Sequence, residues 1–299
     1  MAIASCKHYR RSQYLTEAGS YNNEHIQKRG LVDHLLQTAR EAAEAAAKIH
    51  RRDAGYITLA GATVKARADY VSKTDLDAQE AALEVIHANH PDHTILAEES
   101  DEPLEDQLAR WDGRPLWIVD PLDGTANFLH EHPHYCASVA VAVEGQPVAG
   151  AIVSGSTGER WWASAGEGAF KSGKRIHVST ERPLIEALVG TGFPFKMLEL
   201  MPEYLGQLDR VLRSASGVRR AGSAALDLCY LAQGSLDAFW EEILMPWDFA
   251  AGMILVQEAG GVLTRSDGSD LEIAPGTVRG ANSESLLDEL LGVLQQESV

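Results

Sequence analysis

The stretch Asp120-Pro-Leu-Asp-Gly-Thr-Ala-Asn-Phe128 follows a short apolar run that is typical of a buried strand. Its proline stiffens the turn, and Gly124 lets the backbone come close to a ligand. One tight loop could therefore supply the carboxylates of Asp120 and Asp123 and the backbone carbonyl of Leu122 to adjacent metal ions. Taken alone, the Asp-Gly pair is also an ordinary turn signal. The interpretation of this loop therefore depends on what accompanies it in the chain.

Three other short segments place carboxylates where predicted strands end or helices begin. They are Ser72-Lys-Thr-Asp75, Glu98-Glu99-Ser100 and Trp247-Asp248. Each has a simple explanation on its own, because Glu98-Glu99 could be a solvated strand end, and the two aspartates could cap helices. Strand ends in layered α/β folds face the crevice where ligands bind. Several oxygen ligands without histidine or cysteine suit Mg²⁺ or Mn²⁺ better than zinc, so the combination predicts a metal site.

The composition is that of a globular chain with an ample supply of core residues. The chain has 299 residues, of which 45% are hydrophobic, and 43 acidic against 26 basic side chains give a net charge of −17. Such a charge argues against a protein that coats nucleic acid, which needs a basic face. An anionic substrate is still compatible with it, because bound cations invert the local charge.

The sequence shows no sign of a membrane or secreted protein. No apolar run approaches the ~20 residues that a membrane-spanning helix needs. The first residues lack the apolar region of a secretory signal. The cysteines Cys6, Cys136 and Cys229 lie far apart and form neither a disulfide framework nor a zinc spacing. These features favour a reduced, cytoplasmic setting without membrane or direct nucleic-acid contacts.

Residue periodicity predicts a mixture of helices and strands. Helices are expected at about 31–49, 75–90, 223–233, 248–259 and 283–296, and strands at 94–97, 116–119, 137–144, 147–154, 160–165 and 236–240. The strands between 137 and 165 are expected to form an antiparallel meander. Thr74 stands three residues before Asp77, which suggests a capping box for the second helix.

The domain organisation is expected to be simple. Residues 1–30 are polar and aperiodic and are interpreted as an N-terminal extension. The remainder, 31–299, is expected to form one layered domain with an N-lobe of about 31–170 and a C-lobe of about 171–299. Glycine-rich turns between Gly166 and Gly173 suggest this boundary.

The carboxylate segments belong to a longer pattern that resembles the inositol monophosphatase family. The matching blocks are Val71-Ser-Lys-Thr-Asp75, Glu98-Glu99-Ser100, Asp120 to Phe128, Gly222-Ser-Ala-Ala-Leu-Asp227, Trp247-Asp-Phe-Ala-Ala-Gly252 and Glu258-Ala-Gly-Gly261. The resemblance covers roughly 31–290, and the block from Asp120 to Phe128 is very specific. Thr191-Gly-Phe-Pro-Phe195 and the segment from Arg219 to Asp227 are most similar to the bacterial inositol-1-monophosphatase (extragenic suppressor) branch.

The resemblance implies a fold and an activity. The fold is an α/β five-layer αβαβα sandwich of the sugar-phosphatase type, commonly a homodimer. The activity is that of a Mg²⁺-dependent hydrolase that converts myo-inositol 1-phosphate, or a related inositol monophosphate, to inositol and phosphate. In this family a water held by metal ions attacks the phosphorus directly. Two to three Mg²⁺ ions are implied, with Mn²⁺ able to replace them and Li⁺ acting as an inhibitor.

The resemblance also assigns the metal ligands. The first ion would be held by Glu98, Asp120 and the carbonyl of Leu122, and the second by Asp120, Asp123 and Asp248. Glu99 would orient a metal-bound water and help to place a weaker third ion. Metal ions in such sites activate water and neutralise charge on the phosphoryl oxygens.

The remaining roles concern proton transfer and substrate binding. Thr125, paired with Asp75, would take the proton from the attacking water in a general-base relay. Glu241 would accept hydrogen bonds from ring hydroxyls, and the backbone of Ala224 would touch the substrate. The implied substrate-binding set is Asp123, Gly124, Thr125, Ala224, Glu241 and Asp248.

Relatives that share this chemistry leave the substrate open. Histidinol-phosphate phosphatases have nearly all of these motifs, and Glu241 would also suit the ammonium group of their substrate. Bisphosphate nucleotidases usually follow the Asp-Gly-Thr with a basic residue and Glu, where this chain has Ala126-Asn127. Fructose-1,6-bisphosphatase activity would require basic residues near a second phosphate, and Arg219 and Arg220 keep it open.

A function of a different class is a regulatory binding protein. Bacterial members of the most similar branch can associate with the transcription machinery independently of catalysis. An arginine commonly stands there where this chain has Met245, so the departure touches a surface implicated in partner contacts.

Several polar residues near the motifs are expected to have no chemical role. His130, His132 and His134 follow the metal loop at alternate positions and are interpreted as part of a solvated loop. Lys65 and Asp69 lie where family members support the third ion, but the local spacing differs.

Overall fold

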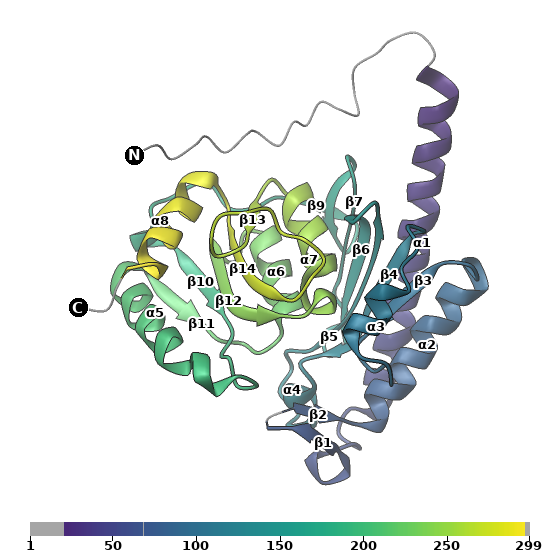
Figure 1. Cartoon of the computed structure of the whole chain (residues 1–299), viewed down its shortest axis with the longest axis horizontal. Helices are drawn as coiled ribbons and strands as arrows, with labels where there is room; N and C mark the ends of the chain where they lie inside the picture. Colours follow the sequence, from purple (N-terminus) through teal and green to yellow (C-terminus); the bar gives the residue numbers. More distant parts are fainter. Residues whose placement is uncertain (1–20, 68, 297–299) are drawn as a thin grey trace.

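The computed structural model describes residues 21–67 and 69–296 and is built around two β-sheets (Figure 1). The larger sheet has the order β3-β4-β5-β6-β7-β8-β9. Its strands are β3 (Thr94–Ala97), β4 (Leu116–Asp123), β5 (Cys136–Val143), β6 (Gln146–Ser154), β7 (Arg160–Ser164), β8 (Gly168–Lys171) and β9 (Lys174–Ile176). β3 and β4 run parallel, and the other neighbours are antiparallel. The predicted meander is therefore confirmed in β5, β6 and β7.

Two long helices, α1 (Tyr21–Asp53) and α2 (Lys73–Asn89), cover one face of this sheet (Figure 1). The buried stripe of α1 is rich in alanine: Ala39, Ala42, Ala43, Ala46 and Ala47 have no exposed surface. Short side chains let a helix lie close to the sheet that it covers. Helix α1 begins at Tyr21 rather than at Leu31, so residues 21–30 of the predicted extension are helical, and residues 1–20 lie outside the described residues.

The predicted cap of α2 is wrong. The helix is capped by Ser72, whose Oγ accepts from the Thr74 amide at 3.2 Å, and Asp75 accepts from the Ser72 amide at 2.7 Å. Ser72 is the last extended residue, so Thr74 already lies inside the helix and cannot cap it. Asp77 instead contacts Arg52 and Lys73.

The smaller sheet has the order β11-β10-β12-β14-β13. Its strands are β10 (Leu188–Thr191), β11 (Gly217–Arg219), β12 (Ala238–Leu244), β13 (Val262–Thr264) and β14 (Gly276–Ala281). The helices of this half are α5 (Met201–Ser214), α6 (Ala224–Ala232), α7 (Pro246–Glu258) and α8 (Glu284–Leu294). The predicted strand at 236–240 is thus shifted toward the C-terminus, because Leu236 and Asp237 precede β12.

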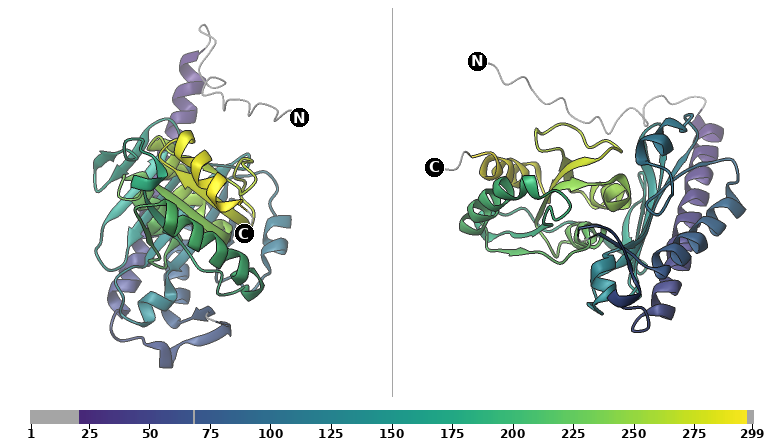
Figure 2. Two further views of the ribbon diagram at one scale, coloured as in Figure 1. Left: turned by 90° about the vertical axis from the view of Figure 1, so that its left-hand side faces the viewer. Right: turned by 60° about the horizontal axis from the view of Figure 1, so that its bottom comes forward.

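The right-hand view of Figure 2 shows the helices and sheets arranged in layers, and three of the apolar cores lie between these layers. One core joins α1 and α2 to the larger sheet. A second joins the other face of that sheet to α6 and α7 and, through them, to the smaller sheet. The third joins the smaller sheet to α5 and α8. The order helix, sheet, helix, sheet, helix confirms the expected layered sandwich.

The shorter elements lie at the edges of these layers. They are β1 (Thr63–Ala66), β2 (Asp69–Val71), α3 (Leu104–Ala109), α4 (Thr125–Leu129) and the 3₁₀ turns η1 (Leu59–Gly61), η2 (Leu184–Glu186) and η3 (Leu198–Leu200). Within residues 21–67 and 69–296, no helix is both long and apolar enough to span a bilayer. The division into two lobes near 170 stays a prediction, and β9 carries the larger sheet on to Ile176.

Candidate active site

Glu98 and Asp120 stand side by side at the ends of two parallel strands. Ala97 of β3 pairs with Val119 of β4, and the Glu98 amide donates to the Val119 carbonyl at 3.2 Å. Burial raises the pKa of Asp120, and the carboxyl groups of Glu98 and Asp120 are close enough that repulsion from Glu98 adds to this shift. Asp120 is 1% exposed. Adjacent parallel strands end at the same edge of a sheet, so this topology brings together two acids that lie far apart in the sequence.

An irregularity at the end of β4 brings Asp123 to the same region. Asp120 pairs with Ser138 and Asp123 with Cys136, so β4 advances three residues where β5 advances two. Residues three apart in a regular strand point to opposite faces, and one extra residue cancels that alternation. Pro121 sits inside this bulge, where the lack of a backbone N–H does not interrupt the ladder.

The loop after the bulge is held from several sides. His50 of α1 is fully buried, and its Nε2 lies 2.7 Å from the Pro121 carbonyl. Because a carbonyl only accepts, Nε2 carries the proton, and Nδ1 has no hydrogen-bond partner in the described part of the chain. Gly124 has φ +92°, and a Cβ there would lie 2.9 Å from the His134 carbonyl. The turn therefore requires glycine on two grounds.

Asp123 links this loop to the N-terminus of α6. Its Oδ2 accepts from the Ser223 hydroxyl at 2.5 Å and from the Ala225 amide at 2.8 Å. Burial raises the pKa of Asp123 to about 6, although these two hydrogen bonds favour its ionised form. Oδ2 of Asp123 thus accepts the hydrogen bonds that join two layers of the fold. These two donors do not bind Oδ1.

Asp248 enters the site from the first turn of α7. Its Oδ2 accepts from the Met245 amide at 2.7 Å, so the simple explanation of a helix cap is correct. Burial raises the pKa of Asp248 to about 7, and repulsion from Asp123 adds to this shift. The cap therefore does not exclude a second role, because the aspartate also lies within the electrostatic reach of the other acids.

The acidic group carries more charge than the lysines around it can offset. Burial raises the pKa of Glu98 to about 8, with further repulsion from Asp248 and Glu99, and it also raises the pKa of Asp120 well above its usual range. Lys65 forms an ion pair with Glu99. Lys196 pairs instead with Asp69 at 2.8 Å.

These acids lie near one another, but their side chains do not converge on a common point. In residues 21–67 and 69–296, no three histidine, cysteine, aspartate or glutamate side chains converge in a way that could hold a metal ion. Carboxylates that repel one another are expected to converge once a cation offsets their charge. Carboxylate and carbonyl oxygens are the donors that Mg²⁺ prefers.

Asp75 and Thr125 meet from segments 50 residues apart. The Thr125 hydroxyl lies 2.8 Å from Asp75 Oδ1 and 3.0 Å from the Leu122 carbonyl. Asp75 is 1% exposed, and its other oxygen accepts from the amide and the hydroxyl of Ser72. Burial raises the pKa of Asp75, while the hydrogen bonds from Ser72 and Thr125 lower it.

Glu241 and Ala224 belong to elements of the C-terminal half of the chain. Glu241 is on β12, its carboxylate covers Gly192, and Ala224 begins α6. Burial raises the pKa of Glu241 well above its usual range, with repulsion from Asp248 and Asp227 adding to the shift. Electrostatic repulsion thus links Glu241 to Asp123 and Asp248 of the acidic group.

The histidine segment is only partly the solvated loop that was expected. His130 and His132 are exposed, but the ring of His134 stacks on Tyr230 at 5.7 Å, and its Nε2 lies 3.5 Å from Asp227. The His134 carbonyl also accepts from the Asn127 amide at 2.7 Å. Its backbone thus supports the loop that contains Gly124.

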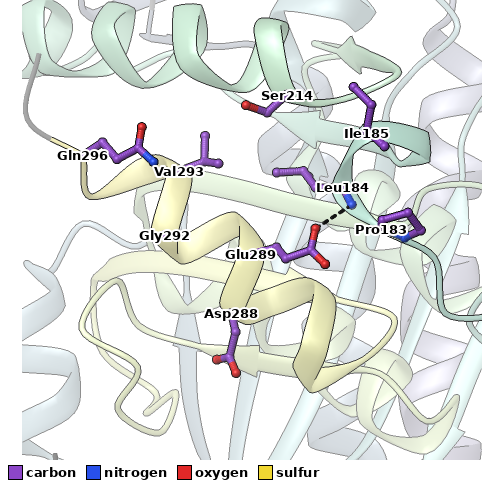
Figure 3. Close-up of a pocket in the computed structure, with 9 residues that line it drawn as sticks. All are labelled: Pro183, Leu184, Ile185, Ser214, Asp288, Glu289, Gly292, Val293 and Gln296. Atoms are coloured by element: carbon purple, nitrogen blue, oxygen red, sulfur yellow. Dashed lines mark hydrogen bonds between the residues drawn. The ribbon is translucent and has the colours of Figure 1, made fainter. Parts of the chain in front are cut away.

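The pocket in Figure 3 lies away from these residues. It has a volume of ≈ 370 Å³ and opens beside α8, with Glu289 bonded to the Leu184 amide at 2.8 Å. None of the predicted site residues lines it.

The sequence did not indicate four residues whose hydrogen bonds hold the segments of the site in place. They are His50, Gln79, Asn127 and Ser223. Gln79 exchanges two hydrogen bonds with the backbone of Glu99. His50 gave one usable signal, since a histidine on the apolar stripe of a helix needs a buried partner.

Comparisons with known proteins show the family of this chain and solved structures that are similar to it. The pattern of the inositol monophosphatase family matches residues 31–298. An inositol-1-monophosphatase of Rhizobium meliloti (strain 1021) is 37% identical over 262 residues, which are 88% of this chain and 96% of that protein. A Nus factor SuhB of Pasteurella multocida (strain Pm70) is 36% identical over 260 residues, which are 87% and 94% of the two chains. The crystal structure of the extragenic suppressor protein suhB from Bartonella henselae superposes with a TM-score of 0.77 at 34% identity, covering 89% of this chain and 99% of its own.

Proposed function

Since the chain belongs to the inositol monophosphatase family, we propose that it hydrolyses myo-inositol 1-phosphate, or a related inositol monophosphate, to inositol and phosphate. The family relationship supports a phosphatase. The observation that carries the proposal is the grouping of Glu98, Asp120, Asp123 and Asp248 beside the Thr125–Asp75 pair. Two functions are thereby combined at one place, a set of cation ligands and a proton acceptor.

Mg²⁺ is the cofactor that this donor set fits. Glu98, Asp120 and the Leu122 carbonyl would hold one ion, and Asp120, Asp123 and Asp248 a second, with Glu99 near a weaker third. When bound, such ions lower the pKa of water and neutralise the phosphoryl oxygens. Mn²⁺ is proposed as a substitute and Li⁺ as an inhibitor.

The proposed route for the proton of the attacking water passes through Thr125 and Asp75. The Thr125 hydroxyl donates to Asp75 Oδ1, so its oxygen is left with lone pairs for a proton from water. As that proton arrives, the hydroxyl proton passes to Asp75. Burial raises the pKa of Asp75, which helps this carboxylate to accept it.

The other residues bind the substrate. The backbone amides of Gly124 and Thr125 would contact the phosphate at the turn before α4, and Glu241 would accept from the ring hydroxyls. Asp123, Asp248 and the backbone of Ala224 complete the proposed set. A site built to pair hydroxyls rejects analogues that lack them.

Substitution of Gly192 by alanine tests the role of Glu241. The new methyl group would overlap the Glu241 carboxylate, which must then move, whereas the backbone of Gly192 is not strained. We expect kcat/KM for inositol 1-phosphate to fall about tenfold, mainly through KM. The matched control is Gly292→Ala on α8, where a Cβ meets nothing within 4 Å. Equal kinetics for both variants would remove Glu241 from the substrate site.

The substrate is tested by phosphate release from a panel in the presence of Mg²⁺. The panel holds inositol 1-phosphate, histidinol phosphate, fructose 1,6-bisphosphate and adenosine 3′,5′-bisphosphate, each with and without Li⁺. We expect the fastest phosphate release from inositol 1-phosphate, and we expect Li⁺ to abolish this release. A preference for histidinol phosphate would keep every catalytic residue and replace the substrate.

A second candidate function is regulatory, because several similar proteins bear the name Nus factor SuhB. This chain has Met245 where the branch commonly has arginine, which weakens the transfer of that role. Binding to the transcription machinery would survive Asp123→Asn, whereas phosphatase activity would not. A homodimer is also proposed, and sedimentation at the mass of a single chain would contradict it.

A further inference from the structure

Arg279 of β14 is a buried cation directly behind the candidate substrate acid. It is 1% exposed and ranks among the largest fully buried side chains. Its Nη1 donates to the Glu241 carbonyl at 2.6 Å, and its Nη2 donates to Glu242 Oε1 at 2.6 Å. The buried Nε has no hydrogen-bond partner within the described residues. Nη1 also donates to the carbonyl of the neighbouring Val278 at 3.2 Å, so a guanidinium that is costly to bury binds two successive residues of β12 and its own strand.

The side chains of Arg279 and Glu241 lie on opposite faces of the smaller sheet. Arg279 is directly opposite Trp240 in the β12–β14 ladder, and directly opposed residues share a face. Trp240 stacks on Tyr204 of α5 at 6.0 Å, so this is the outer face. Glu241 alternates with Trp240 and turns inward, where its carboxylate covers Gly192. Arg279 thus donates to the Glu241 carbonyl from the outer face of the sheet.

The ladder between the two strands becomes irregular at this point. Glu241 pairs with Val278 and Leu244 with Gly276, so β12 advances three residues while β14 advances two. A bulge leaves backbone groups without their regular ladder partners. The guanidinium supplies a donor to the Glu241 carbonyl where the regular ladder ends. It therefore fixes the strand just before it turns toward Met245 and the first turn of α7.

We propose that Arg279 is a positioning residue that sets substrate discrimination, because it holds the backbone of Glu241 and thereby the carboxylate that pairs with substrate hydroxyls. This rests on the proposed function, in which Glu241 binds the polyol. The residue does not touch the substrate. Its effect should therefore appear with substrates that offer hydroxyls to Glu241 and be absent with those that offer none.

The test must separate positioning from stability. Removing Arg279 alone would leave the Glu242 carboxylate buried without its partner, which destabilises a protein whatever the site does. The informative variant is the double substitution Arg279→Met with Glu242→Met, which removes both charges and keeps the volume. The control is Glu242→Gln, since its amide oxygen can still accept from Nη2 and the bond to the Glu241 carbonyl stays.

The kinetic readout compares inositol 1-phosphate with p-nitrophenyl phosphate, which offers no ring hydroxyl to Glu241. For the double variant we expect kcat/KM for inositol 1-phosphate to fall about tenfold through KM, with little change for p-nitrophenyl phosphate. Glu242→Gln should match the wild type with both. An unchanged ratio, or an equal loss with both substrates, would overturn the proposal.

A crystal structure of the double variant gives a readout that does not depend on activity. Displacement of the Glu241 carboxylate from Gly192 supports the positioning role, and an unmoved carboxylate overturns it. If the wild type itself fails to prefer inositol 1-phosphate, the proposed function fails, while this structural comparison still decides whether Arg279 places Glu241.

Discussion

Replacing Asp123 by asparagine is expected to lower phosphate release by at least about 100-fold while the protein stays folded. Residues that only orient metal ligands already cost 10- to 100-fold in affinity or activity, and a direct ligand should cost no less. The fold should persist because an asparagine oxygen can still accept from Ser223 and from the Ala225 amide. The loss of one negative charge also relieves the repulsion that raises the pKa of Asp248.

Two measurements check this expectation. Steady-state kinetics with inositol 1-phosphate gives the loss of turnover, and thermal unfolding gives the stability. Asp270→Asn is the matched control, because Asp270 is exposed and far along the chain from the acidic group. If Asp123→Asn keeps most of its rate, the placement of the metal site is wrong.

Replacing Thr125 by alanine is expected to lower kcat by about 10²- to 10⁴-fold, the range that a positioned general base contributes. Alanine removes the hydroxyl that bridges to Asp75, whereas serine keeps it. Thr125→Ser should therefore stay within a few fold of the wild type. Metal affinity, measured by calorimetry with Mg²⁺, should change little in either variant. A serine variant as slow as the alanine variant would argue that the methyl group, and not the hydroxyl, matters.

A double-mutant cycle tests whether Thr125 and Asp75 act together. If one relay includes both, Asp75→Asn should add little to the loss already caused by Thr125→Ala. Asp75 also accepts from the Ser72 amide and hydroxyl at the start of α2, and an asparagine oxygen can still accept only part of this charge-assisted bonding, so Asp75→Asn changes a helix cap as well as the relay. The Thr125 variants do not change this cap and are the cleaner pair. Additive losses in kcat would show that the two residues act independently.

The layered fold could be predicted from local pattern together with family resemblance. Alternation at 137–165 predicts the meander, and the helical spacing of apolar residues between Leu31 and Ile49 predicts the first helix. The ends of the helices were harder to predict. The start of α1 was missed because residues 21–30 lack apolar periodicity, and the cap of α2 was misplaced by two residues.

The candidate site could be predicted only as a set of segments. The block at 120–128 identifies the loop, but the alternation of a strand says that Asp120 and Asp123 point apart, and only the β4 bulge removes this conflict. The spacing of the sequence could indicate that His50 needs a buried partner but not which one, and it gave no indication of the role of Arg279. Each acts through a backbone carbonyl on another element, those of Pro121 and Glu241, and a sequence does not reveal such contacts.

Asp248 fits two interpretations, that of a helix cap and that of a metal ligand. The Asp248 carboxylate caps α7 through the Met245 amide, as an ordinary helix cap would. The same carboxylate lies within the electrostatic reach of Glu98 and Asp123. Structural and chemical roles are therefore compatible in one residue, and the simple explanation does not count against the functional one.

The most direct test of the account is phosphate release from inositol 1-phosphate by the purified chain after removal of divalent metal with a chelator. We predict no turnover in excess chelator, full recovery when Mg²⁺ is restored, and loss of the recovered activity with Li⁺. Full activity in the presence of the chelator would contradict the assignment of the acidic group as a metal site.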